Sequence, residues 1–171
     1  MKRFLAISML LCIILCGCSS GYKKGEALLQ EGKFAEAKVF FQTLIDEEKD
    51  LKQAYYGMGI SCFELKEYEK AAGFLEEALV HKTANTVETY SMLGACYIEM
   101  QQYDKALESY QKVLADENLT DTLQQEAEYN LIAVHEHMGD WDAAEQQLEK
   151  YKSQYPDDTR LDKESIFLET R

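Results

Sequence analysis

The three histidines of this chain are the first side chains to test for chemistry, and their spacing argues against a metal site. His135 and His137 stand two positions apart, so on a helix they point to different sides, whereas metal-binding pairs stand three or four positions apart. His81 stands alone near an expected helix end, where a dipole contact explains it. Paired carboxylates predict solvated surface at Glu47–Glu48, Glu76–Glu77 and Asp157–Asp158. Without a glycine-rich phosphate loop or a nucleophile elbow, the sequence predicts no enzyme, no metal site and no cofactor.

Cys18 is the residue with the most specific predicted chemistry. A short basic run at residues 1–3 precedes the apolar stretch FLAISMLLCIIL, which ends at Leu15 and is too short for the roughly 20 residues of a spanning helix. This is the layout of a secretory signal. The tetrapeptide LCGC at 15–18 resembles the bacterial lipobox. The resemblance implies that residues 1–17 are a lipoprotein signal peptide and that Cys18 carries lipid; the alternative is an ordinary signal peptide with incidental cysteines.

A lipid on Cys18 would anchor the protein at the extracytoplasmic face of a bacterial cell membrane or outer membrane, because more than one acyl chain holds stably. Residues 18–21 would then be the lipidated cysteine and a short tether, since the first expected helix begins at Tyr22. Three residues reach at most about 10 Å, so no stalk lifts the folded part from the bilayer. Lys23 and Lys24 follow; they either meet anionic headgroups or belong to a solvated helix face.

The composition is that of a folded, acidic protein. Hydrophobic residues make up 46% and charged residues 29%, with a single proline, which is not the profile of a disordered chain. Removal of residues 1–17, which carry two cations and no acids, would take the net charge from −13 to −15. A nucleic-acid partner requires a basic face, so the charge predicts that the protein does not bind nucleic acid.

Apolar side chains recur with helical period on both sides of a polar break at Gln101–Gln102. In the stretch Tyr90–Leu114, the spacing i, i+4, i+7 occurs once on each side of the break, first at Leu93, Tyr97 and Met100 and then at Ala106, Tyr110 and Val113. The pattern predicts a hairpin of two helices, each with one apolar stripe. Neither helix can cover the stripe of the other alone, so such a unit must be repeated and stacked.

Further copies of this hairpin pattern occur along the chain. The equivalent residues are small at Gly25, Gly59 and Gly94, followed by alanine at Ala37, Ala71, Ala106 and Ala144, and by a large apolar residue at Phe41, Leu75, Tyr110 and Leu148. The first three copies are spaced by 34 and 35 residues, and the pattern resembles the tetratricopeptide repeat, whose period is 34. The resemblance covers residues 22–156 in four units. In the last unit Ile132 replaces the small residue, and its bulk is expected to separate the two helices.

The resemblance implies an all-α fold, a right-handed superhelix of about four helix hairpins. Terminal repeats need a cover for their apolar face, and residues 157–171 are expected to supply it as a C-terminal capping helix. Capping signals in the linkers predict helix starts near 51, 86 and 122, from Asp50 with Gln53, Asn85 with Glu88, and Asp121 with Gln124.

Apart from the leader cysteines and Cys18, two cysteines remain, Cys62 and Cys96, each on the packing side of a first helix. A disulfide is one possibility in an oxidising compartment. The two residues occupy neighbouring but unequal repeat positions, and buried cysteine also behaves as a small hydrophobe. We favour the second interpretation.

In the tetratricopeptide family the first helices of successive repeats line a concave groove that holds an extended peptide or a helix of a partner. Carried over by register, the groove residues of this chain are Tyr22, Glu26, Gln53, Tyr56, Ile60, Glu64, Glu88, Met92, Glu99, Tyr129, Asn130, Ala133 and His137. The tyrosines are suited to anchoring a partner, and the carboxylates favour a basic one. Some family members grip a C-terminal carboxylate with a cationic clamp, but the matching positions here hold Tyr22, Glu26, Gly57, Glu88 and Met92.

Two functions are compatible with these features. The first is a membrane-anchored interaction scaffold or assembly factor that binds a partner segment in the groove. The alternative is a lipid-anchored binding protein that captures a small solute or a cell-wall peptide. A closed pocket with converging polar groups would favour capture, whereas an open groove favours a protein partner.

Overall fold

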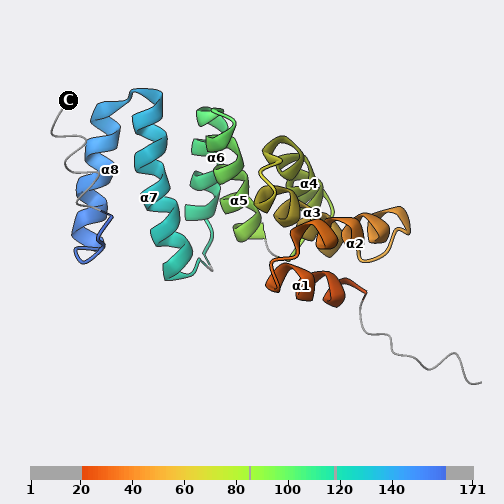
Figure 1. Cartoon of the computed structure of the whole chain (residues 1–171). Helices are drawn as coiled ribbons and strands as arrows, with labels where there is room; N and C mark the ends of the chain where they lie inside the picture. The colour runs from red at the N-terminus through yellow and green to blue at the C-terminus, as the bar shows by residue number, and fades with distance from the viewer. Residues whose placement is uncertain (1–20, 85, 118, 161–171) are drawn as a thin grey trace, which may run out of the picture.

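The computed structural model describes residues 21–84, 86–117 and 119–160, and within these ranges the chain forms eight helices and no strand (Figure 1). The helices are α1 (Tyr22–Gln30), α2 (Phe34–Asp46), α3 (Leu51–Glu64), α4 (Tyr68–Val80), α5 (Thr86–Glu99), α6 (Tyr103–Leu114), α7 (Asp121–Met138) and α8 (Trp141–Gln154). The expected signal peptide and Cys18 lie outside the described residues. Of the expected capping helix, residues 157–160 form turns and the remainder also lies outside.

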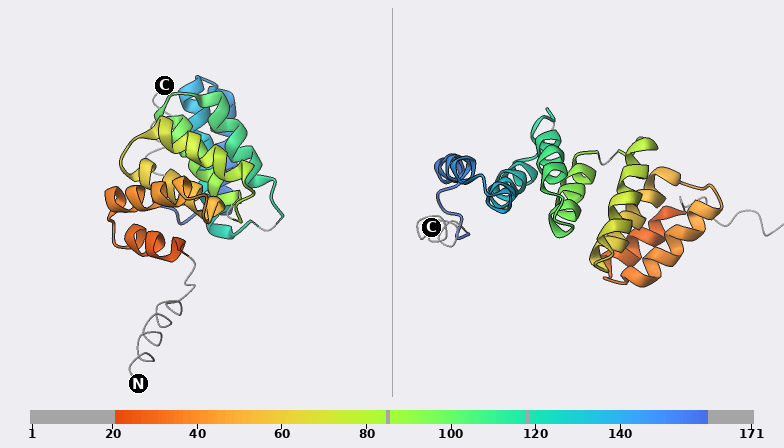
Figure 2. Two further views of the ribbon diagram at one scale, coloured as in Figure 1. Left: turned by 90° about the vertical axis from the view of Figure 1, so that its right-hand side faces the viewer. Right: turned by 90° about the horizontal axis from the view of Figure 1, so that it is seen from above.

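The helices form four hairpins that follow one another from α1–α2 at one end of the molecule to α7–α8 at the other (Figures 1 and 2). Each first helix, α1, α3 or α5, contacts the first helix of the next hairpin. No such contact joins the second helices α2, α4, α6 and α8 over the described part of the chain. The first helices therefore lie on the inner, concave side, and the array is the all-α superhelix that the repeats predict.

Close packing within the first three hairpins depends on a glycine in the first helix and a large residue in the second. A Cβ atom added to the glycine would lie far inside van der Waals contact in each case: Gly25 to Phe41 Cζ 2.4 Å, Gly59 to Leu75 Cδ2 2.6 Å, and Gly94 to Tyr110 Cζ 2.6 Å. The three large side chains are almost completely buried. These pairs are the ones that the repeat spacing aligned, so the predicted register is confirmed.

The last hairpin is built differently, because Ile132 stands where the others have glycine. Ile132, Leu148 and Tyr151 form a small apolar cluster that is separate from the main core; we call it the terminal cluster. Tyr129 and Tyr155 pack against it.

Three of the helices begin where the linker residues predict, at Leu51, Thr86 and Asp121, but the capping differs. Asp50 makes no side-chain hydrogen bond to α3 and has a left-handed backbone with φ of 47°. Its carboxylate instead accepts a hydrogen bond from the backbone N–H of Tyr22 at 3.3 Å, at the start of α1. α7 is capped by Thr120, not by Asp121, since the Thr120 hydroxyl accepts from the Leu123 N–H at 3.4 Å.

The turns inside the four hairpins adopt the same backbone conformation. Each contains a residue with positive φ, at Gly32, Lys66, Gln101 and Gly139. The N–H after that residue donates to a carbonyl five positions earlier, as in Glu67 to Cys62 at 2.8 Å and Gln102 to Tyr97 at 2.8 Å. This is the Schellman arrangement, which closes the carbonyl end of a helix. The common turn gives all four hairpins a similar geometry.

Candidate functional site

Five of the predicted groove residues line one pocket on the concave side, between α1, α3 and the linker that precedes α5. The pocket has a volume of about 230 Å³. α1 contributes Tyr22 and Glu26, four positions apart, and α3 contributes Gln53, Tyr56 and Ile60. Because these spacings are helical, each helix turns its residues to one face. The pocket is completed by Leu29, Phe41, Gly57, Thr83 and Ala84.

The floor of the pocket is apolar and depends on Gly57. A Cβ atom at Gly57 would lie 2.2 Å from Phe41 Cζ, so only glycine allows the Phe41 ring to cross under α3. Phe41 is 1% exposed. Tyr22 and Tyr56 are half-buried and pack on the main core, while Glu26 at the rim is exposed. A side chain that enters the pocket would therefore meet aromatic walls below and a carboxylate at the rim.

One wall of the pocket comes from the linker between α4 and α5, which the repeat pattern did not identify. Thr83 is 7% exposed, and its backbone N–H donates to the Ala78 carbonyl at 3.0 Å. The Thr86 hydroxyl donates to the Thr83 carbonyl at 3.1 Å. These bonds hold Thr83 against the ends of α4 and α5. Gly57 could have been noticed as a second glycine in α3, two positions before the repeat glycine Gly59.

The predicted groove residues of the middle repeats lie outside the lining of this pocket. Glu64, Glu88 and Glu99 are exposed, and Met92 is half-buried against the main core. Burial, together with the nearby carboxylates of Glu99 and Glu64, raises the pKa of Tyr68 at the start of α4. Glu64 and Glu99 are the last residues of α3 and α5, so they lie at the edge where the hairpins turn, at the rim of the concave face.

The predicted groove residues of α7 have ring and cation contacts with neighbouring elements. Tyr129 is half-buried, and the guanidinium carbon of Arg160 lies 4.1 Å from its ring centre. His137 stacks on Tyr103 of α6, with ring centres 4.9 Å apart and an angle of 5° between the planes. The other two residues on this face, Asn130 and Ala133, are half-buried.

The concave side is acidic toward its C-terminal end. α5 and α7 contain no lysine or arginine, and four of their six carboxylates are exposed: Glu88, Glu99, Asp121 and Glu126. Glu136 is half-buried, and Glu128 is buried and paired with Lys150. The lysines with ion pairs belong mostly to the second helices and their turns, as in the contacts of Glu67 with Lys38 and Lys70. A basic segment would therefore be attracted to the first helices of the last two repeats.

The two cysteines within the described ranges are free and buried. Burial raises the pKa of the Cys96 thiol to about 12, and it raises the pKa of Cys62 as well. The thiolate is the form that attacks an electrophile or a disulfide, and it is scarce at neutral pH under these conditions. Both residues therefore act as small apolar side chains of the core, as the sequence favours.

Two features of the described residues bear on the class of site. Over residues 21–84, 86–117 and 119–160, no group of three or more histidine, cysteine, aspartate or glutamate side chains is placed to hold a metal ion. No helix within those ranges has both the length and the apolar character needed to cross a bilayer.

Comparison with solved structures identifies chains of the same architecture. MamA from Desulfovibrio magneticus RS-1, residues 41 to the end, superposes with a TM-score of 0.75 at 20% identity, covering 87% of this chain and 81% of that one. YrrB, described as a tetratricopeptide repeat protein with an unusual peptide-binding site, superposes with a TM-score of 0.67 at 22% identity, covering 78% and 66%. At these identities the likeness establishes the fold alone.

Sequence comparisons identify the repeats themselves. A curated relative, the Hsp70-Hsp90 organising protein of Plasmodium falciparum (isolate 3D7), is 27% identical over 101 residues, which is 56% of this chain and 18% of that protein. This chain thus matches less than a fifth of the length of that relative. Three family models described as tetratricopeptide repeat match residues 19–50, 53–116 and 97–163. Together they span the eight helices, and the chain belongs to the tetratricopeptide repeat family.

Proposed function

We propose that this protein is a membrane-anchored scaffold that binds a segment of another protein along its concave face. A protein-interaction role follows from the repeat family and its architecture. The observation that carries the proposal is the convergence of Tyr22, Glu26, Gln53, Tyr56 and Ile60 in one pocket on that face. Aromatic anchors that fill pockets provide most of the binding energy in protein interfaces.

The dimensions of the pocket favour a protein partner over capture of a free solute. A volume of about 230 Å³ is smaller than the roughly 300–1,000 Å³ of sites that enclose a small molecule. It has room for one large side chain of a partner that continues along the groove. The tyrosine walls suit an apolar or aromatic stem, and Glu26 at the rim suits a cationic tip. A partner with basic residues next to long side chains matches both features.

The proposed anchor is supported by the lipobox-like sequence at 15–18 and by the position of α1. α1 begins at Tyr22, so residues 19–21 alone separate it from Cys18. The carboxylate of Asp50 binds the first N–H of α1 and ties this helix to the second repeat. An acyl chain on Cys18 would hold the concave face close to the extracytoplasmic surface of the membrane, where it could assemble with other envelope proteins.

The test begins with site-specific photocrosslinking in the native membrane. Benzoylphenylalanine in place of Gln53, an exposed residue at the pocket, is expected to capture a partner that the same group in place of Gln111, an exposed residue of α6, does not. With that partner purified, Tyr56→Ala is expected to cost about 2 kcal/mol, which is about a thirtyfold rise in Kd. Most of the loss should be faster dissociation.

The matched control is Val80→Ala, because Val80 is 72% exposed on α4, a second helix on the convex side. Its Kd is expected to stay within a factor of about two of the wild type. If the partner binds the Tyr56→Ala protein as tightly as it binds the Val80→Ala protein, the concave pocket is not the binding site.

A further inference from the structure

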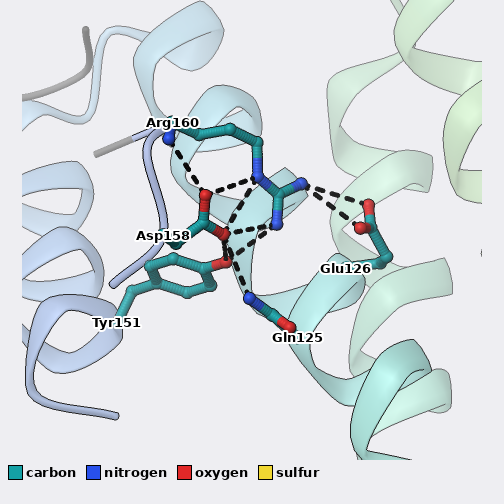
Figure 3. A network of polar contacts seen from close by, with 5 residues as sticks. All are labelled: Gln125, Glu126, Tyr151, Asp158 and Arg160. Carbon is teal, nitrogen blue, oxygen red and sulfur yellow. Dashed lines mark hydrogen bonds and ion pairs between the residues drawn. The ribbon is translucent and has the colours of Figure 1, made fainter. Parts of the chain in front are cut away.

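The chain segment that follows α8 turns back and lies against α7 (Figure 3). Asp158 holds this segment in place, since its Oδ2 atom accepts hydrogen bonds from the Tyr151 hydroxyl at 2.5 Å and from Gln125 Nε2 at 3.0 Å. The hydrogen bonds from Arg160, together with the one from the Tyr151 hydroxyl, hold the pKa of the Asp158 carboxyl well below its usual range. Asp158 is therefore ionised at neutral pH and fixes the direction in which Arg160 points.

The Arg160 guanidinium rests in a cradle made of an aromatic ring and three acceptor groups. Its central carbon lies 4.1 Å from the centre of the Tyr129 ring. Nη1 lies 3.3 Å from both carboxylate oxygens of Glu126, and Nη2 donates to the Tyr151 hydroxyl at 2.9 Å. Nε and Nη2 also donate to Asp158, with Nη2 at 2.7 Å from Oδ2.

The chemistry of this cradle is specific for a planar, forked cation. A guanidinium can stack on an aromatic face and direct N–H groups to both oxygens of a carboxylate at the same time. An ammonium group is a point charge and cannot do both. Glu126 and Tyr129 belong to α7, a first helix without lysine or arginine, and Tyr129 is one of the predicted groove residues. The cradle therefore lies on the surface that a partner segment would follow.

We propose that this face of α7, formed by Glu126 and Tyr129, is a binding site for an arginine side chain of a partner, and that Arg160 occupies it in the free protein. The inference rests on the proposed function in one respect: it takes the concave face as the binding surface. Arg160 is then an internal competitor, and a partner must displace it. The ion pair with Glu126 can open, because its side chains are 33% and 48% exposed and such surface pairs are individually weak. Full displacement must also break the contacts of Arg160 with Asp158, whose side chain is 9% exposed.

An internal competitor lowers the observed affinity by the fraction of molecules in which the site is open. If Arg160 occupies the cradle about nine-tenths of the time, its removal strengthens binding of an arginine ligand about tenfold. A lysine ligand of the same charge gains little, because it does not use the stacked, forked geometry. This difference separates the release of a competitor from a general change in charge, since Arg160→Ala also makes the surface more acidic.

The experiment titrates fluorescein-labelled hexaarginine and hexalysine peptides into the full chain and measures fluorescence polarisation. Arg160→Ala is expected to bind hexaarginine about tenfold more tightly than the wild type, with the Kd for hexalysine changed less than twofold. Arg160→Lys keeps the charge, and it should show most of the same gain. Adding Tyr129→Leu to Arg160→Ala should abolish the gain, because the ring face is lost. Helical circular dichroism of each variant checks that it is folded.

Equal affinities of wild type and Arg160→Ala for hexaarginine would overturn the proposal, and so would an equal gain for both peptides. A gain that survives Tyr129→Leu would also overturn it. The result is independent of the pocket at Tyr56. If Tyr56→Ala does not change the affinity of the native partner, the proposed binding pocket is contradicted. The peptide titrations, in contrast, report on α7 alone.

Discussion

Two glycines of the same hairpin separate the effect of packing from that of backbone freedom. Gly59 in α3 faces the completely buried Leu75, whose Cδ2 would lie 2.6 Å from an added Cβ, whereas Gly73 in α4 has open space at that position. We expect Gly59→Ala to lower the free energy of unfolding by about 1–3 kcal/mol through overpacking. Gly73→Ala should raise it by about 0.5–1 kcal/mol, because alanine is the better helix former.

Thermal denaturation followed by circular dichroism measures both changes, and the two melting temperatures should move in opposite directions. A shift of the same sign for both variants would contradict the assignment of Gly59 as the close contact of the hairpin. The exposed Gly73 serves as the control for the substitution itself, since it lies in a helix of the same hairpin.

Individual groove residues could be predicted only where helical spacing decides which face they occupy. Tyr22, Gln53 and Tyr56 converge in the pocket because their spacing and the repeat register fix both face and neighbour. The role of Gly57 could not be predicted in this way, since it depends on the path of the Phe41 ring from another helix. Arg160 was missed for a similar reason: no periodicity links it to Tyr129, 31 positions earlier.

At the scale of elements, the hairpin turns contain avoidable strain. Gln101 has φ of 58° in the turn between α5 and α6, where the corresponding residues of the first and last hairpins are Gly32 and Gly139. A left-handed backbone costs a residue with a side chain about 1–2 kcal/mol. We expect Gln101→Gly to raise the free energy of unfolding by about 0.5–1 kcal/mol, measured by urea denaturation.

The neighbouring residue Gln102 provides the control, because its φ is −97°. This backbone is not strained, so replacement by glycine removes no strain. Gln102→Gly should lower stability or leave it unchanged, through the added freedom of the unfolded chain. A stabilising effect of Gln102→Gly, or a clear loss for Gln101→Gly, would show that the turn is not strained in the folded protein.

The helix boundaries were more predictable than the contacts that fix them. Helix starts at Leu51 and Thr86 follow from the polar linkers before them. The capping interpretation of Asp50 is wrong because it considered only the helix that follows, whereas the carboxylate binds the N–H of Tyr22, 28 positions earlier. Such a bond depends on how two repeats stack, and local spacing contains no information about it.

For the whole molecule, the proposed lipid anchor depends on a single thiol. We expect the wild type expressed in a bacterium to partition into the detergent phase of Triton X-114. Cys18→Ala should remain uncleaved or move to the aqueous phase, because no acyl chain can be attached. The control is Cys62→Ala, in which a buried core thiol is removed and the partition should be unchanged. Identical partition of the wild type and Cys18→Ala would contradict the lipoprotein hypothesis.

The architecture was the most predictable feature, because the same pair of packed positions recurs in successive repeats. The pairs Gly25 with Phe41 and Gly94 with Tyr110 express one contact, and agreement among copies fixed the register. The predicted order of hairpins and the all-α class followed from it. The last hairpin, with Ile132, departs from the rule, and its geometry could not be taken from the others.

The terminal cluster has a consequence for how the molecule unfolds. α7 joins the main core through Ala127, Leu131 and Val134. Its other face meets α8 through the smaller terminal cluster and through contacts of Glu128 with Gln147 and Lys150. Local opening of α8 would therefore leave the main core intact, so the boundary between cooperative units falls inside the last hairpin. The main core would remain as a support, and the end at α8 would loosen as conditions become less favourable.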